Sequence, residues 1–159
     1  MKILLVAATA NEVQNLSAYF KLAKDNFITH TKFDLLITGV GMTATAFALG
    51  KTLKSTYNLV LNVGIAGSFD KNISLGSLVN VTNDVFAELG AEDNERFISI
   101  DELGFGKSTY AAGYNLSSLP KVKGITVNKV HGNAKSIEVI QQRLNPKVES
   151  MEGAAVFYA

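Results

Sequence analysis

Short, mostly apolar runs alternate along the chain with segments in which apolar residues recur at helical spacing. Four runs in the first half have the continuous apolar character of strands buried on both faces. They are Ile3–Ala7, Phe33–Thr38, Leu59–Val63 and Leu78–Thr82. The helical patterns cover residues 13–24 and 42–54. A strand, a glycine turn, a helix and a further strand in succession indicate βαβ units, and therefore a largely parallel sheet.

The middle of the chain has a different character, because residues 84–102 carry seven of the 14 acidic residues and residues 103–120 are rich in Gly, Ser and Tyr. We expect a long surface excursion, which in compact domains is often a binding loop, with aromatic residues that pin it down or stack on a ligand. Regular pattern then resumes with a strand, a helix, a short strand and the start of a helix: 124–128, 136–144, 147–151 and 152–159. The chain predicts one domain, residues 1–159, with a three-layer α/β/α architecture around a mixed, mostly parallel central sheet.

Composition narrows the classes of function. Hydrophobic residues make up 47% of the chain, which fits a globular protein and not a disordered one. The net charge of +1 gives no reason to expect nucleic acid or an anionic membrane as a partner. The absence of cysteine excludes disulfides, thiolate metal sites and thiol nucleophiles, and two histidines leave little for a zinc site. No apolar run reaches signal-peptide or membrane-spanning length, so we expect a cytoplasmic protein.

Two glutamates stand directly after predicted strands. Glu12 follows the first strand and Glu152 follows the last. Ligands of an open parallel sheet bind beyond the carboxyl ends of its strands, so both side chains would border one crevice. Cleavage of a glycosidic bond needs such carboxylates, because positive charge develops on the sugar and a water must be activated. The alternative for Glu12 is a solvated residue in the first turn of a helix, where negative charge complements the helix dipole.

Two glycine turns also follow strands. Residues 39–44 match the G-x-G-x-x-A pattern of dinucleotide-binding sites, but no acidic residue occurs between Met42 and Phe69 to hold a ribose. We therefore expect this turn to offer backbone N–H groups to an anion or water, and not to bind NAD. The backbone of the second turn, residues 64–69, could approach a flat ligand or could serve packing alone. His131, between a strand and a helix, is either a ligand contact or a cap of its turn.

Three segments, in the right order, resemble motifs of the nucleoside phosphorylase/nucleosidase superfamily. They are the opening MKILLVAATANEV, the glycine turn NVGIAGSF at residues 62–69 and VESMEGAA at residues 148–155. Because they are spread over almost the whole chain, the resemblance implies the superfamily's fold and not a local motif alone.

The resemblance also implies roles for individual residues. A glutamate at the place of Glu12 positions or activates the attacking water in the hydrolases of the superfamily. The turn that contains Ala66 and Gly67 would lie beside the purine. Glu152 would hydrogen-bond the ribose hydroxyls, and Met151 would pack under the sugar.

Within the superfamily the chain most resembles the futalosine hydrolases, through NDVFAELGAEDNERF at residues 83–97 and VNKVHGN at residues 127–133, which contains His131. The resemblance implies hydrolysis of futalosine or aminodeoxyfutalosine, with release of hypoxanthine or adenine, in the futalosine route to menaquinone. It implies no metal or organic cofactor, a small-molecule nucleoside as ligand, and a homodimer or larger homo-oligomer.

Phosphorolysis would require groups that bind phosphate, usually arginines. The chain has two, Arg96 in the acidic excursion and Arg143 late in a predicted helix, so water is favoured as nucleophile, although lysines could substitute. One alternative is a nucleosidase for methylthioadenosine or adenosylhomocysteine, and another is a truncated, non-catalytic nucleoside-binding module. The second arises because the last predicted helix has no stop signal before Ala159. We expect the superfamily's C-terminal strand and helix, with the Asp or Asn that contacts the purine, to lie outside residues 1–159.

Overall fold

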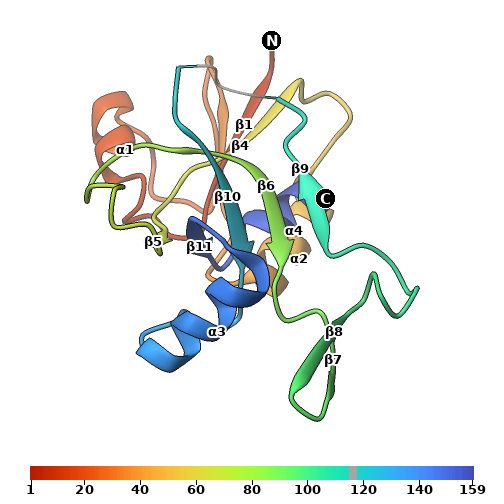
Figure 1. Cartoon of the computed structure of the whole chain (residues 1–159). Helices are drawn as coiled ribbons and strands as arrows, with labels where there is room; N and C mark the ends of the chain where they lie inside the picture. Colours follow the sequence, from red (N-terminus) through yellow and green to blue (C-terminus); the bar gives the residue numbers. More distant parts are fainter. Residues whose placement is uncertain (115–117) are drawn as a thin grey trace. The chain divides into compact units, whose positions relative to one another are not determined.

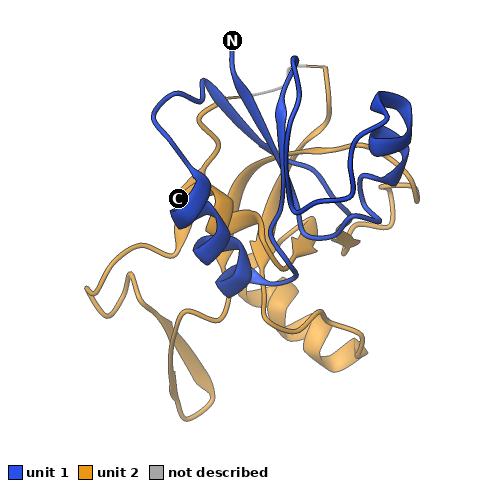
Figure 2. Cartoon of the chain, turned by 180° about the vertical axis from the view of Figure 1, so that it is seen from behind, with its two compact units in different colours: residues 1–65, 159 blue, residues 66–158 orange. Residues whose placement is uncertain are grey.

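A computed structural model describes residues 1–114 and 118–159 of the chain. These residues form two compact units, unit 1 (residues 1–65 with Ala159) and unit 2 (residues 66–158), which Figure 2 distinguishes by colour. Each unit has a main sheet of its own. That residues 1–159 form a single nucleoside phosphorylase-like domain stays a prediction.

Unit 1 contains a four-stranded sheet in the order β2, β3, β1, β4 (Figure 1). Its strands are β1 (Ile3–Ala7), β2 (Phe27–Thr29), β3 (Asp34–Ile37) and β4 (Leu59–Asn62). β1 runs parallel to both β3 and β4, and β2 pairs antiparallel with β3 at the edge. The three strands expected in this part are confirmed. β2 is not indicated by the sequence pattern, because three residues are too few to define a period.

The helices of unit 1 are α1 (Gln14–Phe20), which follows β1, and α2 (Met42–Thr52), which follows β3. α1 is shorter than the 13–24 pattern predicts, because Lys21 adopts a left-handed backbone conformation (φ 51°) that ends the helix. The apolar core of this unit collects buried residues from β1, β3 and the segments beside them: Ala7, Val13, Phe33 and Leu35.

Unit 2 contains a five-stranded sheet in the order β5, β11, β10, β6, β9. Its strands are β5 (Gly67–Ser68), β6 (Asn80–Phe86), β9 (Thr109–Ala111), β10 (Lys121–Thr126) and β11 (Val148–Ser150). β10 lies at the centre, parallel to β11 and β6, whereas β5 and β9 pair antiparallel at the two edges. The carboxyl ends of β10 and β11 therefore point the same way, which places the segments that follow them at one edge of the sheet.

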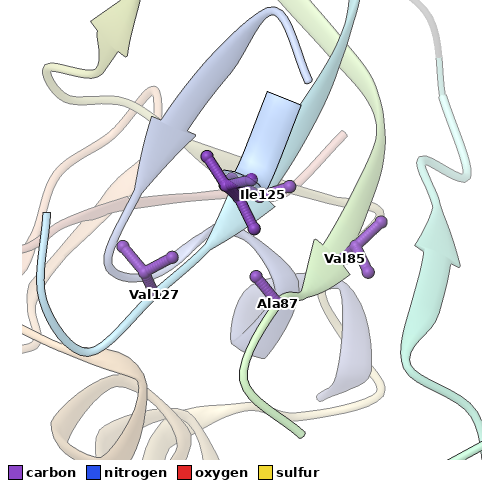
Figure 3. Packing of buried hydrophobic residues seen from close by; sticks show 5 residues of the cluster. Val85, Ala87, Ile125 and Val127 are labelled. Atoms are coloured by element: carbon purple, nitrogen blue, oxygen red, sulfur yellow. The ribbon is translucent and has the colours of Figure 1, made fainter. Parts of the chain in front are cut away.

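Two helices follow these strands, α3 (Ala134–Leu144) and α4 (Gly153–Tyr158). The Asn133 side chain caps α3 by accepting hydrogen bonds from the backbone N–H groups of residues 135 and 136, at 2.9 and 3.4 Å. The core of unit 2 lies between the sheet and α3 and contains Val85, Ala87, Ile125, Val127 and Ile140; Figure 3 labels four of them. All elements expected after residue 120 are confirmed, with ends that differ by at most three residues from the predicted ones.

The stretch from 84 to 120 is not the irregular excursion that its composition predicts. β6 continues into it, β9 belongs to the sheet, and β7 (Gly90–Asp93) and β8 (Arg96–Ser99) form a separate two-stranded hairpin, visible away from the sheet in Figure 1. The turn uses Asn94 at φ 53°, a residue type that tolerates this conformation. The surface location is confirmed for β7, which is exposed throughout, but the stretch has regular structure that the composition does not predict. Neither GAED in β7 nor RFIS in β8 alternates apolar with polar residues, so the period of two is hidden. Residues 115–117 of this stretch lie outside the described residues.

The hairpin is held to α3 by an arginine. The guanidinium of Arg143 lies 4.0 Å from the centroid of the Phe97 ring and donates a 2.7 Å hydrogen bond to the carbonyl of Ala87. At least one aromatic residue of the stretch thus anchors it to the rest of unit 2, which is the first of the two roles that the sequence suggests for these residues.

The expected mixed α/β fold class is confirmed, with strands that are mostly parallel in the interior of each sheet. They are distributed over two main sheets and a hairpin instead of one central sheet. Within the part of the chain that the structure describes, no helix is long and apolar enough to cross a membrane.

Candidate active site

Glu12 lies in the segment of unit 1 that follows β1, and its carboxylate accepts three hydrogen bonds. Its Oε2 accepts from the backbone N–H and the hydroxyl of Thr9, at 2.7 and 3.1 Å, and its Oε1 accepts from the N–H of Ile65 at 3.2 Å. α1 begins only at Gln14, so Glu12 does not lie in its first turn. The alternative of a solvated residue that complements a helix dipole is therefore wrong, because this carboxylate links the ends of β1 and β4.

The loop after β4 approaches this carboxylate closely because residue 64 is a glycine. A Cβ atom at Gly64 would lie 2.6 Å from Oε1 of Glu12 and 3.2 Å from its Cδ. Any other residue would push the carboxylate or the loop away. The glycine turn at 64–69 thus has a packing function at its first residue, one of the two interpretations that the sequence leaves open.

Ala66 and Gly67 lie at the start of unit 2, and both are exposed. Gly67 belongs to the short edge strand β5 and pairs with Glu149 of β11. A Cβ atom at Gly67 would lie 3.2 Å from Cγ of Glu149, so the glycine lets the edge strand lie against that side chain. The backbone at Ala66 and Gly67 is nevertheless exposed, as binding of a flat ligand requires.

His131 forms a pair with Glu149 that the sequence does not predict. The two are 18 positions apart, yet Nδ1 of His131 lies 2.6 Å from Oε2 of Glu149, and the backbone N–H of His131 donates to Oε1 at 2.9 Å. The Glu149 side chain is 5% exposed and the His131 side chain 14%. The ring of Phe69 meets the imidazole edge to face, with centroids 6.0 Å apart. His131 is therefore fixed on one side while part of its side chain reaches the surface.

Met151 and Glu152 stand between β11 and α4, beyond the carboxyl end of the strand as expected. Glu152 is buried, with 8% of its surface exposed, and its Oε2 accepts from the N–H of Met151 at 3.1 Å. The N–H groups of Glu152 and Gly153 both donate to the hydroxyl of Ser150, at 3.4 and 3.1 Å. These bonds shape the turn that presents the Glu152 carboxylate.

A second carboxylate that the sequence does not single out lies under this turn. Asp84, in β6, is 2% exposed, and its Oδ1 accepts a 2.9 Å hydrogen bond from the hydroxyl of Thr126. The same hydroxyl oxygen accepts from the N–H of Ala154 at 2.7 Å, at the start of α4. Burial raises the pKa of Asp84 from 3.8 to about 7, against the opposing effect of its hydrogen bonds to Thr126 and to the backbone of Val85. Asp84 therefore supports the start of the helix that directly follows Glu152.

Glycines make room for this buried carboxyl group. A Cβ atom at Gly124 would lie 3.0 Å from Oδ2 of Asp84, and a Cβ atom at Gly153 would overlap with that oxygen and lie 3.1 Å from Cγ. The glycine of the MEGAA segment is thus explained by contact with a carboxylate 69 positions earlier in the chain.

The sequence-predicted site residues fall into two groups. In unit 2, Gly67 and His131 meet on Glu149, and Glu149 stands three positions before Glu152 in the same chain segment. Glu12 belongs to unit 1, so the pairing of Glu12 with Glu152 across one crevice stays a prediction. The sequence gives little signal for the two missed residues, since Asp84 and Glu149 lie in strands that contain other polar residues, NVTNDVF and VES.

The other glycine turn, at 39–44, joins β3 to α2. Gly39 and Gly41 have φ values of 86° and 97°, a region that favours glycine, and Gly41 is the N-cap residue of α2. Tight-turn geometry thus accounts for both glycines without a dinucleotide. Among the described residues, no group of three or more His, Cys, Asp or Glu side chains is placed to hold a metal ion.

Comparison with known sequences confirms the resemblance to nucleosidases. No protein-family model matches the chain. The futalosine hydrolase of Streptomyces coelicolor is 31% identical over 139 residues, which cover 78% of this chain and 59% of that protein. The 5′-methylthioadenosine/S-adenosylhomocysteine nucleosidase of Glaesserella parasuis is 33% identical over 90 residues, or 50% of this chain and 39% of that protein. The chain therefore matches less than two thirds of the length of either relative.

Comparison with solved structures shows the fold. A 5′-methylthioadenosine/S-adenosylhomocysteine nucleosidase of Helicobacter pylori superposes with a TM-score of 0.81 at 16% identity, over 99% of this chain and 78% of that one. The native futalosine hydrolase of the same organism superposes with a TM-score of 0.81 at 14% identity. The superposition covers 99% of this chain and 77% of that one. The chain has the mixed α/β fold of these nucleosidases.

Proposed function

We propose that this chain belongs to the nucleoside phosphorylase/nucleosidase superfamily and hydrolyses the N-glycosidic bond of futalosine or aminodeoxyfutalosine, releasing the purine base. The observation that carries the proposal is the 31% identity to a futalosine hydrolase over 78% of the chain. The geometry agrees with it, because the carboxylates of Glu12 and Glu152 both stand just beyond the carboxyl ends of strands.

Glu12 is the proposed general base. When ionised its carboxylate is an acceptor only, and three donors from Thr9 and Ile65 restrict its orientation. Such a fixed carboxylate can take a proton from a water molecule as that water attacks the anomeric carbon and the bond from this carbon to the base nitrogen breaks. The electron pair of that bond leaves with the purine.

Unit 2 supplies the proposed contacts to the nucleoside. Glu152 accepts hydrogen bonds from the ribose hydroxyls and Met151 packs under the sugar, as the resemblance implies. The exposed backbone at Ala66 and Gly67 lies along the purine, and His131 contacts the nucleoside from the loop between β10 and α3.

Water is the proposed nucleophile in preference to phosphate, because both arginines are engaged in holding the β7–β8 hairpin. Arg96 forms an ion pair with Glu102. Arg143 covers the Phe97 ring and donates to a backbone carbonyl. The Arg143 guanidinium is thereby occupied, and Arg96 lies on the exposed hairpin beside an acidic partner, so neither forms a prepared site that would grip a phosphate dianion with two parallel hydrogen bonds.

A second candidate is hydrolysis of 5′-methylthioadenosine or S-adenosylhomocysteine. It is favoured by the relative from Glaesserella parasuis and by a Helicobacter pylori nucleosidase with 5′-methylthioadenosine in its active site, which superposes with a TM-score of 0.78 at 14% identity. The two substrate classes share the purine and ribose contacts and differ at the 5′ substituent. A place in the futalosine route to menaquinone, a cytoplasmic location and a homo-oligomeric state are parts of the proposal that follow from the first candidate.

The test is incubation of the protein with futalosine, aminodeoxyfutalosine and methylthioadenosine, each with and without phosphate, and chromatography of the free base. We expect base release from futalosine or aminodeoxyfutalosine without phosphate. Release that requires phosphate and yields ribose 1-phosphate would exclude a hydrolase. Release from methylthioadenosine alone would select the second candidate.

A further inference from the structure

The Glu149–His131 pair in unit 2 has an arrangement that determines where the imidazole proton lies. Oε1 of Glu149 faces an N–H group that can only donate, the backbone amide of His131 at 2.9 Å. Oε2 faces Nδ1 of the same residue at 2.6 Å, the short distance of a charge-assisted hydrogen bond. An ionised carboxylate has no hydrogen to donate, so Nδ1 supplies the hydrogen of this bond and Glu149 accepts twice.

The carboxylate cannot easily turn away from this arrangement. Its side chain is 5% exposed, and Gly67 of the edge strand lies against its Cγ, where a Cβ atom would come within 3.2 Å. The His131 ring is held from another side by Phe69. Both the position and the rotation of the imidazole are therefore set by neighbours within unit 2.

The second ring nitrogen is the one left for a ligand. Among the described residues, none forms a hydrogen bond with Nε2 of His131, and this atom is not one of the buried polar atoms without a partner. It can therefore meet solvent or a ligand. In a neutral imidazole with its proton on Nδ1, Nε2 is a hydrogen-bond acceptor.

We propose that Glu149 is a positioning residue that holds His131 in the Nδ1–H tautomer, so that Nε2 accepts a hydrogen bond from a donor group of the bound nucleoside, such as a base N–H or a ribose hydroxyl. The proposal rests on the proposed function in one respect, namely that His131 contacts the substrate. The carboxylate of a catalytic triad acts on its histidine in the same way, by selecting the tautomer without touching the substrate. Glu149 is thus assigned to the binding site although it is buried and makes no contact with the ligand itself.

The first experiment reads the tautomer directly in the protein without ligand. The chain has two histidines, so the ¹⁵N-edited spectrum of the imidazole rings contains two spin systems, and the His131→Gln variant assigns them by the loss of one. We expect the neutral ring of His131 to carry its proton on Nδ1. A proton on Nε2 in the parent protein would overturn the proposal, whether or not the protein hydrolyses any nucleoside.

The second experiment inverts the tautomer. In Glu149→Gln the amide keeps the shape of the side chain, its oxygen can still accept from the backbone N–H, and its NH₂ group donates to Nδ1. The imidazole proton must then move to Nε2, which becomes a donor facing a donor on the ligand. We expect the spectrum to show the Nε2–H tautomer and the Kd for inosine, used as the probe, to rise about 10- to 150-fold. Glu138→Gln, the same change at an exposed position on α3, is the matched control and should change neither.

A double variant separates positioning from a merely structural role. If Glu149 acts through His131, the variant that carries both Glu149→Gln and His131→Gln should bind inosine no more weakly than His131→Gln alone. The proposal would be overturned if the losses of inosine affinity in the two single variants added up in the double variant. It would also be overturned if the tautomer of His131 were unchanged in Glu149→Gln. If the tautomer changes as expected but inosine binding is unaffected in every variant, the part that concerns ligand contact is wrong while the tautomer assignment stands. If the tautomer and inosine binding change as expected but the parent protein hydrolyses no nucleoside, the proposed function is wrong and the role of Glu149 stands.

Discussion

Replacement of Asp84 by asparagine should stabilise the protein considerably more at pH 8 than at pH 5. The carboxyl group lies in β6 at 2% exposure, and burial raises its pKa from 3.8 to about 7. Between these two values the native state keeps a proton that the unfolded state has lost. The stability that this group contributes is therefore greatest below pH 3.8, declines as the pH rises and levels off once the pH passes 7.

The magnitude follows from the two pKa values. Their difference corresponds to about 4 kcal/mol of unfolding free energy over the whole range, of which about 2.5 kcal/mol is lost between pH 5 and pH 8. Asparagine resembles the protonated acid, because its oxygen can accept from Thr126 as Oδ1 does and its NH₂ group takes the place of the protonated Oδ2. Asp84→Asn should therefore lack this pH dependence.

Urea unfolding followed by far-UV circular dichroism measures the effect. The difference in unfolding free energy between Asp84→Asn and the parent should grow by about 2.5 kcal/mol from pH 5 to pH 8, roughly 1 M or more in urea midpoint. Because the difference between the two proteins is taken at each pH, the contributions of all other titrating groups to the pH dependence of stability cancel. The control is Asp70→Asn, because the hydrogen bond from Lys147 is the main cause that lowers the pKa of Asp70, so this carboxyl is ionised throughout the range. A growth of less than about 0.5 kcal/mol for Asp84→Asn would refute the argument from burial.

Three further predictions concern the glycines and glutamates of the site. Gly153→Ala should destabilise the protein by about 1–3 kcal/mol in the same urea assay, because the new Cβ atom overlaps with the Asp84 carboxyl group. Gly50→Ala in α2, with nothing within 4 Å of its Cβ atom, should instead gain about 0.5–1 kcal/mol, and equal effects of the two would contradict the packing argument. Glu12→Gln should lower kcat for futalosine by about 10²–10⁴-fold with little change in binding, and near-normal turnover would remove Glu12 from the mechanism. Glu152→Gln should weaken both binding and turnover, since each charge-assisted hydrogen bond to a ribose hydroxyl is worth about 1.5–3 kcal/mol. Removal of the substrate's 2′-hydroxyl should cost less affinity in this variant than in the parent, and equal losses would show that Glu152 does not contact that hydroxyl.

The candidate site residues could be proposed from the sequence because ligands of a parallel sheet bind beyond the carboxyl ends of its strands. Glu12 and Glu152 are recognisable as carboxylates that follow strands, and the glycine turns mark where the backbone must approach something closely. The reason for each close approach could not be read in this way. Gly64 faces the Glu12 carboxylate, whereas Gly153 faces Asp84, and the sequence around the two glycines does not distinguish these neighbours.

The β7–β8 hairpin shows a different limit of sequence patterns. β7 (GAED) is exposed and contains only small and acidic residues, and the two apolar residues of β8 (RFIS) are adjacent, so no alternation of apolar and polar positions indicates a strand. The hairpin is stabilised by cross-strand pairing and by the contact between Phe97 and Arg143, two residues that lie 46 positions apart. Pairing partners at such separations are set by topology.

The type and order of most elements can be read from the amino-acid sequence, since the period of apolar residues is a local property of each strand or helix. The sequence also determined the resemblance to nucleosidases, which rests on short motifs read one at a time. The tertiary structure was needed to show that Nδ1 of His131 lies 2.6 Å from Oε2 of Glu149, and that Asp84 is joined through Thr126 to the start of α4. Both pairings depend on the register of β6, β10 and β11, and a shift by one residue would turn the side chain of Asp84 or Glu149 to the opposite face of the sheet.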